Sequence, residues 1–290
     1  FLIAFLFPTD ELRTQNTLPD TARIGAYLDD LYRSNQDSIN VPAYRKRGVR
    51  LSDTALIIAT RYRPWMPDRF HDAWEMRARY MFNYMGKRDS ASKMFDSLLV
   101  WYERDKRFDV KYAQALSNKS RVYFTNALYI QSDSLLQRSL KIFREYGDTL
   151  SVRYARTYNF YGQLLNNLNR PAEAEKVLTK ALHIVRQAGT RRSYMAQLND
   201  WGEVIGRRGK TDQAEQAFLE VRRVLDSLDR PGKLDPMYFA AGVNLSKLYF
   251  KQGKFKVGEA LLLDDLRHNS DTLGSPYFST LTNLAGACFE

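Results

Sequence analysis

A residue suited to a tight turn recurs along most of the chain at nearly constant spacing. Successive occurrences lie 40 to 44 residues apart, at Gly86, Ala127, Asn169, Gly209 and Gly253. Glycine and asparagine tolerate the left-handed backbone conformation that ends a helix or connects two helices. A period of this size is typical of stacked two-helix units. The chain is therefore predicted to form an extended solenoid and not one or two closed globular domains.

Small and large residues alternate at fixed distances from these turns. Seven residues before the turn stand Ser120, Gly162, Gly202 and Ser246, with Arg79 as the exception in the first unit. Four residues before the turn stand Phe82, Tyr123, Leu165, Ile205 and Tyr249. Small residues recur five after the turn (Ala91, Ser132, Ala174, Ala214, Gly258) and large ones nine after it (Phe95, Leu136, Leu178, Phe218, Leu262). This pattern predicts two helices per unit that cross closely at the small residues.

The composition agrees with an all-α fold. The 290 residues include 15 Gly and 9 Pro, which is few for an all-β chain with a turn at every strand end. The only cysteine is Cys288. A disulfide framework and a cysteine-based zinc cluster are therefore excluded, because each needs several thiols within one chain.

Three segments resemble the tetratricopeptide repeat (TPR) family. They are Tyr158–Leu165 with Asn169–Ala174, Trp201–Phe218, and Asn244–Phe255, and the resemblance extends over residues 70–290. It implies an α-α superhelix of antiparallel helical hairpins. The period exceeds the family's usual ~34 residues. A HEAT-like solenoid fits the period better but lacks the small and large positions, so the TPR-like interpretation is preferred.

The resemblance divides the chain into four parts. Residues 1–7 are apolar and indicate the remnant of a signal peptide or membrane anchor, or alternatively a segment that packs on the first helices. Residues 8–19 are a polar linker. Residues 20–67 are expected to form an atypical N-terminal hairpin that caps the solenoid, with helices at about residues 21–34 and 42–62. Residues 68–290 hold the TPR-like repeats, the last of them truncated.

No catalytic constellation is recognisable in the sequence. His71, His183 and His268 lie in different repeats, and neither a glycine-rich phosphate loop nor a nucleophile elbow occurs. The acidic pairs at 29–30 and 264–265 are interpreted as surface residues, because neighbours on a helix point about 100° apart. We therefore predict no enzyme activity, no metal site and no cofactor for this part of the protein.

The TPR resemblance implies a concave groove lined by the first helix of each hairpin. Asparagines recur there at Asn118, Asn159, Asn199 and Asn244, and an amide side chain can bond both C=O and N–H of a bound peptide. The alternative is that these asparagines bridge neighbouring repeats. The complete predicted peptide-binding set is Asn118, Arg121, Asn159, Gln163, Asn166, Asn199, Glu203, Arg207, Asn244 and Lys247. Binding of a chaperone C-terminal carboxylate is disfavoured, because the first lysine position of that clamp is not filled by lysine.

The net charge of +11 results from 44 Lys and Arg against 33 Asp and Glu. The basic clusters are interrupted by acids and lie at turns and outer helices, whereas a nucleic-acid site needs a continuous positive stripe. The sequence therefore predicts no dedicated nucleic-acid site, although a basic nucleic-acid-associated repeat protein remains a further alternative.

The leading functional expectation is a non-enzymatic scaffold that binds a protein or peptide in the groove. With its apolar start, the chain resembles the exported TPR sensor region of bacterial membrane-tethered histidine kinases or helix-turn-helix regulators. That resemblance implies a periplasmic or membrane-anchored location and a tether outside the sequence. The alternative is a cytoplasmic TPR assembly or regulatory adaptor.

Overall fold

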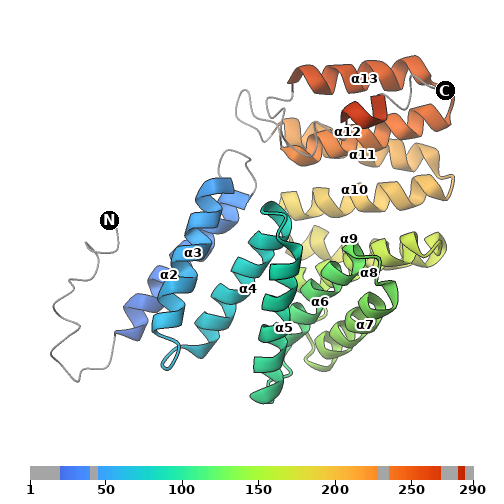
Figure 1. The fold of residues 1–290 in the computed structure, drawn as a ribbon. Helices are drawn as coiled ribbons and strands as arrows, with labels where there is room; N and C mark the ends of the chain where they lie inside the picture. The colour runs from blue at the N-terminus through green and yellow to red at the C-terminus, as the bar shows by residue number, and fades with distance from the viewer. Residues whose placement is uncertain (1–19, 40–44, 228–234, 269–279, 285–290) are drawn as a thin grey trace.

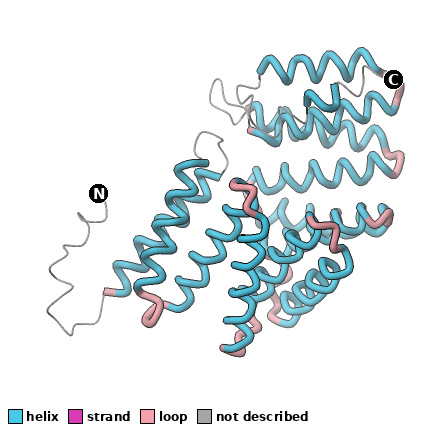
Figure 2. The backbone as a smooth tube through the Cα atoms, in the orientation of Figure 1, coloured by secondary structure: helices cyan, strands magenta, loops and turns pink. Residues whose placement is uncertain are grey.

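A computed structural model describes residues 20–39, 45–227, 235–268 and 280–284. The described part contains no β-strand and is built from helices that pack in consecutive pairs (Figures 1 and 2). The helices are α2 (Thr21–Ile39), α3 (Arg45–Arg61), α4 (Pro67–Tyr84), α5 (Arg88–Arg104), α6 (Val110–Thr125), α7 (Tyr129–Glu145), α8 (Val152–Asn167), α9 (Pro171–Ala188), α10 (Arg191–Arg207), α11 (Thr211–Asp226), α12 (Pro236–Lys251) and α13 (Phe255–His268). The all-α solenoid predicted from the sequence is confirmed. The predicted parts 1–7 and 8–19, and Cys288, lie outside the described residues.

The turn ladder coincides with the ends of the first helices α4, α6, α8, α10 and α12. All five turn residues have positive φ, at 64°, 58°, 58°, 81° and 74° for Gly86, Ala127, Asn169, Gly209 and Gly253. In the last four turns, the next residue's N–H donates to the carbonyl five residues earlier. The N···O distance is, for example, 2.8 Å from Arg170 to Leu165. These bonds satisfy carbonyls that the helix end leaves free.

The first helices also share a way of starting. The side chains of Asp109, Ser151, Thr190 and Asp235 accept hydrogen bonds from backbone N–H groups in the first turns of α6, α8, α10 and α12. Each such cap stabilises a helix by about 1 kcal/mol. The second helices α5, α7, α9 and α11 have no side-chain cap hydrogen bond. A capped start and a left-handed end therefore fix the limits of α6, α8, α10 and α12, whereas α4 starts without a side-chain cap.

The small residues lie where the two helices of a repeat cross. A Cβ placed on Gly162 would lie 2.5 Å from the Leu178 side chain, and one on Gly202 would lie 2.9 Å from Phe218. Both distances are too short for a real contact. The close crossing therefore requires glycine at these two positions, and the large residue nine after the turn fills the space beside it.

Arg79, the exception in the ladder, is explained by one extra residue at the end of α4. The Lys87 N–H bonds the carbonyl of Met81, six residues earlier instead of five. This shift places Ala78 at the small position, fully buried in one cluster with Ala91 and Phe95. Arg79 is displaced by one residue, so it takes the position that follows the crossing.

Helices α2 and α3 pair with each other and pack on α4, at the N-terminal end of the solenoid (Figure 1). Arg69 on α4 bonds the Asp29 carboxylate, with an Nη2–Oδ2 distance of 2.8 Å, and its carbonyl accepts from the Tyr32 hydroxyl at 2.9 Å. An apolar core that includes Leu28, Ala55 and Phe70 joins the three helices. The helices lie close to the ranges expected for an N-terminal hairpin.

The interpretation of Asp265 as a surface residue is wrong. Its side chain is 1% exposed and forms a salt bridge with Arg222 on α11, at an N–O distance of 2.8 Å. The Arg222 guanidinium also lies 3.9 Å from the ring centroid of Tyr238 on α12. Burying a carboxylate requires such a partner, and this one comes from the preceding repeat. The ion pair therefore links three successive helices.

Candidate ligand-binding face of the first helices

The first helices contact each other along the solenoid, in addition to their neighbours in sequence. The pairs α4–α6, α6–α8, α8–α10 and α10–α12 all pack together. We call the exposed and half-buried side chains of these five helices the first-helix face. None of the helices in the described part is long and apolar enough to cross a membrane.

One position of this face repeats in every unit. It directly follows the small residues Ala78, Ser120, Gly162, Gly202 and Ser246, and we call it the post-crossing column. Its members are Arg79, Arg121, Gln163, Glu203 and Lys247, all half-buried or exposed. Four of these five belong to the predicted peptide-binding set. Because a helix turns by about 100° per residue, a side chain here points away from the helix crossing.

The side chains of four of the five predicted asparagines, all except Asn166, take part in contacts between neighbouring first helices. Asn118 is 5% exposed and donates to Glu75 at 2.8 Å, and Asn159 is 7% exposed and donates to Asp200 at 2.7 Å. Asn244 donates to Asn199 at 3.2 Å. These bonds join α6 to α4, α8 to α10, and α12 to α10. The geometry matches the bridging alternative, and main-chain recognition of a peptide by these amides stays a prediction.

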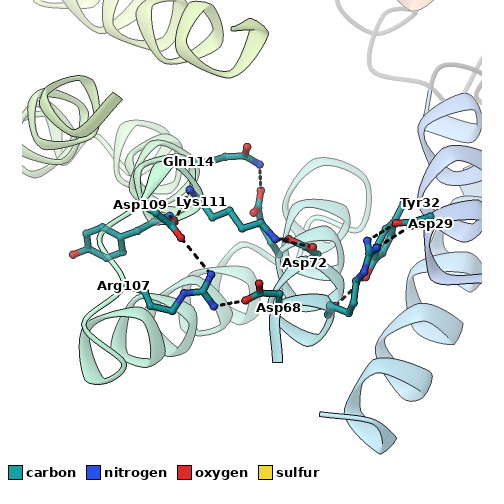
Figure 3. Close-up of polar contacts among 11 residues, drawn as sticks. Asp29, Tyr32, Asp68, Asp72, Arg107, Asp109, Lys111 and Gln114 are labelled. Atoms are coloured by element: carbon teal, nitrogen blue, oxygen red, sulfur yellow. Dashed lines mark hydrogen bonds and ion pairs between the residues drawn. The ribbon is translucent and has the colours of Figure 1, made fainter. Parts of the chain in front are cut away.

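Glu75 on α4 is the acceptor at the N-terminal end of this bridging system. It receives a hydrogen bond from Gln114 (Figure 3) and another from Asn118, one turn later on α6. Burial raises the pKa of the Glu75 carboxyl, while the charge of Arg79 and the bond from Gln114 counteract part of the increase. Lys111 on α6 also bonds Asp72 on α4 at 2.9 Å, and Arg107, in the loop that leads into α6, pairs with Asp68 on α4. Acids along α4 therefore anchor α6.

Asp200 on α10 has the same role farther along the solenoid. Asn159 and Gln163, one turn apart on α8, donate to its Oδ2 at 2.7 and 2.8 Å. Burial raises the pKa of the Asp200 carboxyl, and the amide hydrogen bonds counteract part of that increase. Neither Glu75 nor Asp200 was singled out from the sequence. The available signal was an acid on one first helix and a pair of amides one turn apart on a neighbouring first helix.

Arg121 occupies the middle of the N-terminal half of the face. Its guanidinium carbon lies 5.1 Å from the ring centroid of Phe82 on α4 and 4.7 Å from that of Phe160 on α8. Its Nη2 donates to Asn83 at 3.2 Å. The side chain is thereby held between three successive first helices, and cation–π contacts of this kind stabilise by about 1 kcal/mol each.

The remaining predicted residues have different environments. Asn166 is buried, and its backbone carbonyl accepts a long 3.4 Å hydrogen bond from the exposed Arg207 on α10. Glu203 and Lys247 are exposed members of the post-crossing column. Six residues of the predicted set therefore belong to the first-helix face: Arg121, Gln163, Glu203, Arg207, Asn244 and Lys247. The other four are buried: Asn118, Asn159, Asn166 and Asn199.

Two arginines that the sequence reasoning did not select also lie on this face. Arg156 on α8 is half-buried, and Arg153 is exposed one turn earlier. Burial, with the positive charges of Arg79 and Arg121, lowers the pKa of Arg156 to about 10. The three arginines of α4, α6 and α8 are therefore near enough to repel one another, although each stays charged at neutral pH.

The described residues contain no group of three His, Cys, Asp or Glu side chains that could hold a metal ion. His71 is buried against Trp101 and Tyr102, with ring centroids 5.9 and 4.9 Å away. His268 is exposed and contacts the Asp264 carbonyl. The chemistry that this face offers is thus hydrogen bonding and ion pairing by amides, carboxylates and arginines.

Comparisons with known proteins agree with this architecture. Residues 111–187 match a sequence model described as tetratricopeptide repeat. A Rap protein complexed with Competence and Sporulation Factor aligns with a TM-score of 0.65 at 14% identity, over 92% of this chain and 85% of that chain. BtubC (BKLC) from P. vanneervenii aligns with a TM-score of 0.62 at 18% identity, over 79% of this chain and 92% of its own.

The apo form of the quorum sensor NprR from B. thuringiensis aligns with a TM-score of 0.62 at 14% identity, over 92% of this chain and 71% of that chain. None of the curated proteins matches the sequence. At these identities the likeness to solved structures shows the fold, which is a TPR-like helical solenoid.

Proposed function

We propose that this tetratricopeptide-repeat solenoid is a non-enzymatic scaffold that binds a peptide or protein segment along its first-helix face. The observation that carries the proposal is the post-crossing column, in which five successive first helices present one side chain each at an equivalent position. A row of this kind suits an extended ligand, because regularly spaced side chains can contact successive parts of it. The Rap and NprR structures, one complexed with a named factor and one a quorum sensor, support ligand binding by this fold.

A finer proposal concerns the cellular role. We propose that the chain is the exported ligand-binding region of a bacterial signal-transduction protein, in the periplasm or anchored to the membrane. The apolar residues 1–7 and the likeness to a quorum sensor support this role. A cytoplasmic adaptor is the second candidate, since the same face would serve an intracellular partner equally well.

The scaffold proposal is tested by selecting binders from a library of random-sequence peptides displayed against the chain. A double charge exchange on the post-crossing column, Glu203→Lys with Lys247→Glu, is expected to weaken the selected peptide by at least about tenfold. The matched control is Glu259→Lys with Lys176→Glu, because both residues are exposed on second helices and the net charge is again unchanged. Equal loss in both variants would place the ligand elsewhere, and a library without binders would overturn the scaffold proposal.

The location is tested separately with an epitope-tagged full-length protein in its source cells. Protease added to spheroplasts is expected to remove the repeat region. Protection of this region in intact spheroplasts, with digestion after lysis, would contradict export and favour the cytoplasmic adaptor.

A further inference from the structure

Three successive first helices each place a half-buried arginine on the N-terminal half of the first-helix face: Arg79 on α4, Arg121 on α6 and Arg156 on α8. Within the described part of the chain, the guanidinium groups of Arg79 and Arg156 have no hydrogen bond and no ion pair. This is unusual for a half-buried guanidinium, because removing its hydration without a partner costs free energy.

The Glu75 carboxylate, which interacts with these arginines, already accepts hydrogen bonds from other side chains. Glu75 interacts electrostatically with Arg79, Arg153 and Arg156, but its oxygen accepts the amides of Gln114 and Asn118. A single carboxylate therefore lies among three positive charges. Two neighbouring cations differ from these arginines, because Lys111 and Arg107 each form an ion pair with an aspartate on α4 (Figure 3).

Arg121 gives the cluster a fixed geometry. Its guanidinium lies between the Phe82 and Phe160 rings, and Asn83 accepts one of its N–H groups. Phe82 lies one turn after Arg79 on α4, and Phe160 lies one turn after Arg156 on α8, so the two rings that contact Arg121 place it beside both of these arginines. The rings also exclude water from one side of the cluster, which strengthens an ion pair formed there.

We propose that Arg79, Arg121 and Arg156 form a carboxylate-binding subsite that takes an aspartate or glutamate side chain of the bound peptide. The subsite deepens the proposed function and rests on it. A carboxylate matches the guanidinium fork and can accept two parallel hydrogen bonds. Its negative charge would also relieve the repulsion among the three arginines. The ligand is accordingly an acidic peptide segment, and it lies with its acidic residue over α4, α6 and α8.

The test uses a synthetic peptide taken from the display selection, with its C-terminus amidated, and a matched peptide in which each acidic residue is replaced by its amide. Wild-type protein is expected to bind the acidic peptide at least about tenfold more tightly than the matched peptide. The double variant Arg79→Gln with Arg156→Gln should abolish this difference. The matched control, Arg186→Gln with Arg223→Gln, removes the same charge from exposed positions on second helices and should preserve it.

The outcomes separate the two proposals. Selected peptides without an acidic preference, bound equally by the Arg79/Arg156 variant, would overturn the subsite and leave the scaffold intact. A requirement for a free C-terminus would also overturn it, since the carboxylate would then be the chain end. A library that yields no binder removes the scaffold and the subsite with it.

The thermal unfolding midpoint of the ligand-free protein tests the subsite without any peptide. Because the arginines repel one another in the empty site, Arg156→Gln is expected to raise the thermal unfolding midpoint by a few degrees relative to Arg186→Gln. A lower midpoint for Arg156→Gln, with circular dichroism showing an intact helical fold, would mean that Arg156 stabilises the fold and would contradict the subsite.

Discussion

The two halves of the first-helix face use charged side chains differently. Around α10, Asp200 is surrounded by the amides of Asn159 and Gln163 and has its hydrogen bonds within the protein. Around α4 and α8, Arg79 and Arg156 have no comparable partner in the described residues. The comparison teaches that charged side chains of the same face can join neighbouring repeats in one place and be left for a ligand in another.

The two carboxylates sharpen this comparison. Glu75 and Asp200 each accept two amides one turn apart on a neighbouring first helix, although Glu75 bonds the following repeat and Asp200 the preceding one. Their surroundings differ, because arginines interact with Glu75 from α4 and α8. The same bridging contact is therefore combined with more positive charge around Glu75, which interacts with Arg79, Arg153 and Arg156, than around Asp200, which interacts with Arg121.

The largest effect on stability is expected from removing the carboxylate of Asp200, in the C-terminal half of the first-helix face. Asp200→Ala leaves the Asn159 and Gln163 amides without their acceptor, which should lower the free energy of unfolding by about 1–3 kcal/mol. Urea denaturation measures the change. Glu203→Ala is the control, since Glu203 is exposed on the same helix and its loss should cost less than about 0.5 kcal/mol. Equal effects of both substitutions would show that the Asp200 contacts do not join the repeats as described.

A smaller effect on stability is expected from neutralising the carboxylate of Glu75, in the N-terminal half of the first-helix face. Glu75→Gln keeps an acceptor for the α6 amides but removes the negative charge beside Arg79, so stability should fall by about 1 kcal/mol. The selected acidic peptide should bind several-fold more tightly, because the subsite becomes more positive. Asp200→Asn serves as the comparison and should change peptide affinity less, because among the subsite arginines it is Arg121 that interacts with Asp200. Weaker binding by Glu75→Gln would indicate that Glu75 itself contacts the ligand.

The smallest effect concerns pH. Because the pKa of Asp200 is raised in the folded state, the native protein binds more protons than the unfolded chain between the ordinary value of 3.8 and the raised value. The contribution of Asp200 to stability therefore increases as the pH falls through that window. Relative to Asp200→Asn, wild type should gain stability between pH 7 and pH 4 in urea unfolding. A relative loss on acidification would mean that the hydrogen bonds outweigh burial and depress this pKa.

Much of the fold could be predicted because its determinants are local. The turn at Asn169 and the crossing at Gly162 require particular residue types, whatever lies in the next repeat. Arg79 could not be placed from sequence, since one additional residue at the end of α4 shifts the register of that helix. Asp265 was also misread, because its partner Arg222 lies 43 residues away, in the preceding repeat.

The candidate site was less predictable for a chemical reason. An asparagine such as Asn118 needs the same amide at the same position whether it bonds a ligand backbone or Glu75 of the neighbouring helix. Sequence periodicity identifies the position but not the partner. The arginine cluster escaped notice because Arg156 is not in the post-crossing column that contains Arg79 and Arg121, and its proximity to them arises from the packing of α4, α6 and α8.

The most direct test of the central claim is photo-crosslinking of the selected peptide from single positions of the chain. Benzoylphenylalanine would replace Arg153 on α8 in one protein and Arg186 on α9 in another, since both arginines are exposed and lie on the first and second helix of one repeat. A crosslink from position 153 with little or none from position 186 is the predicted result. A crosslink from position 186 alone would contradict a ligand bound along the first-helix face.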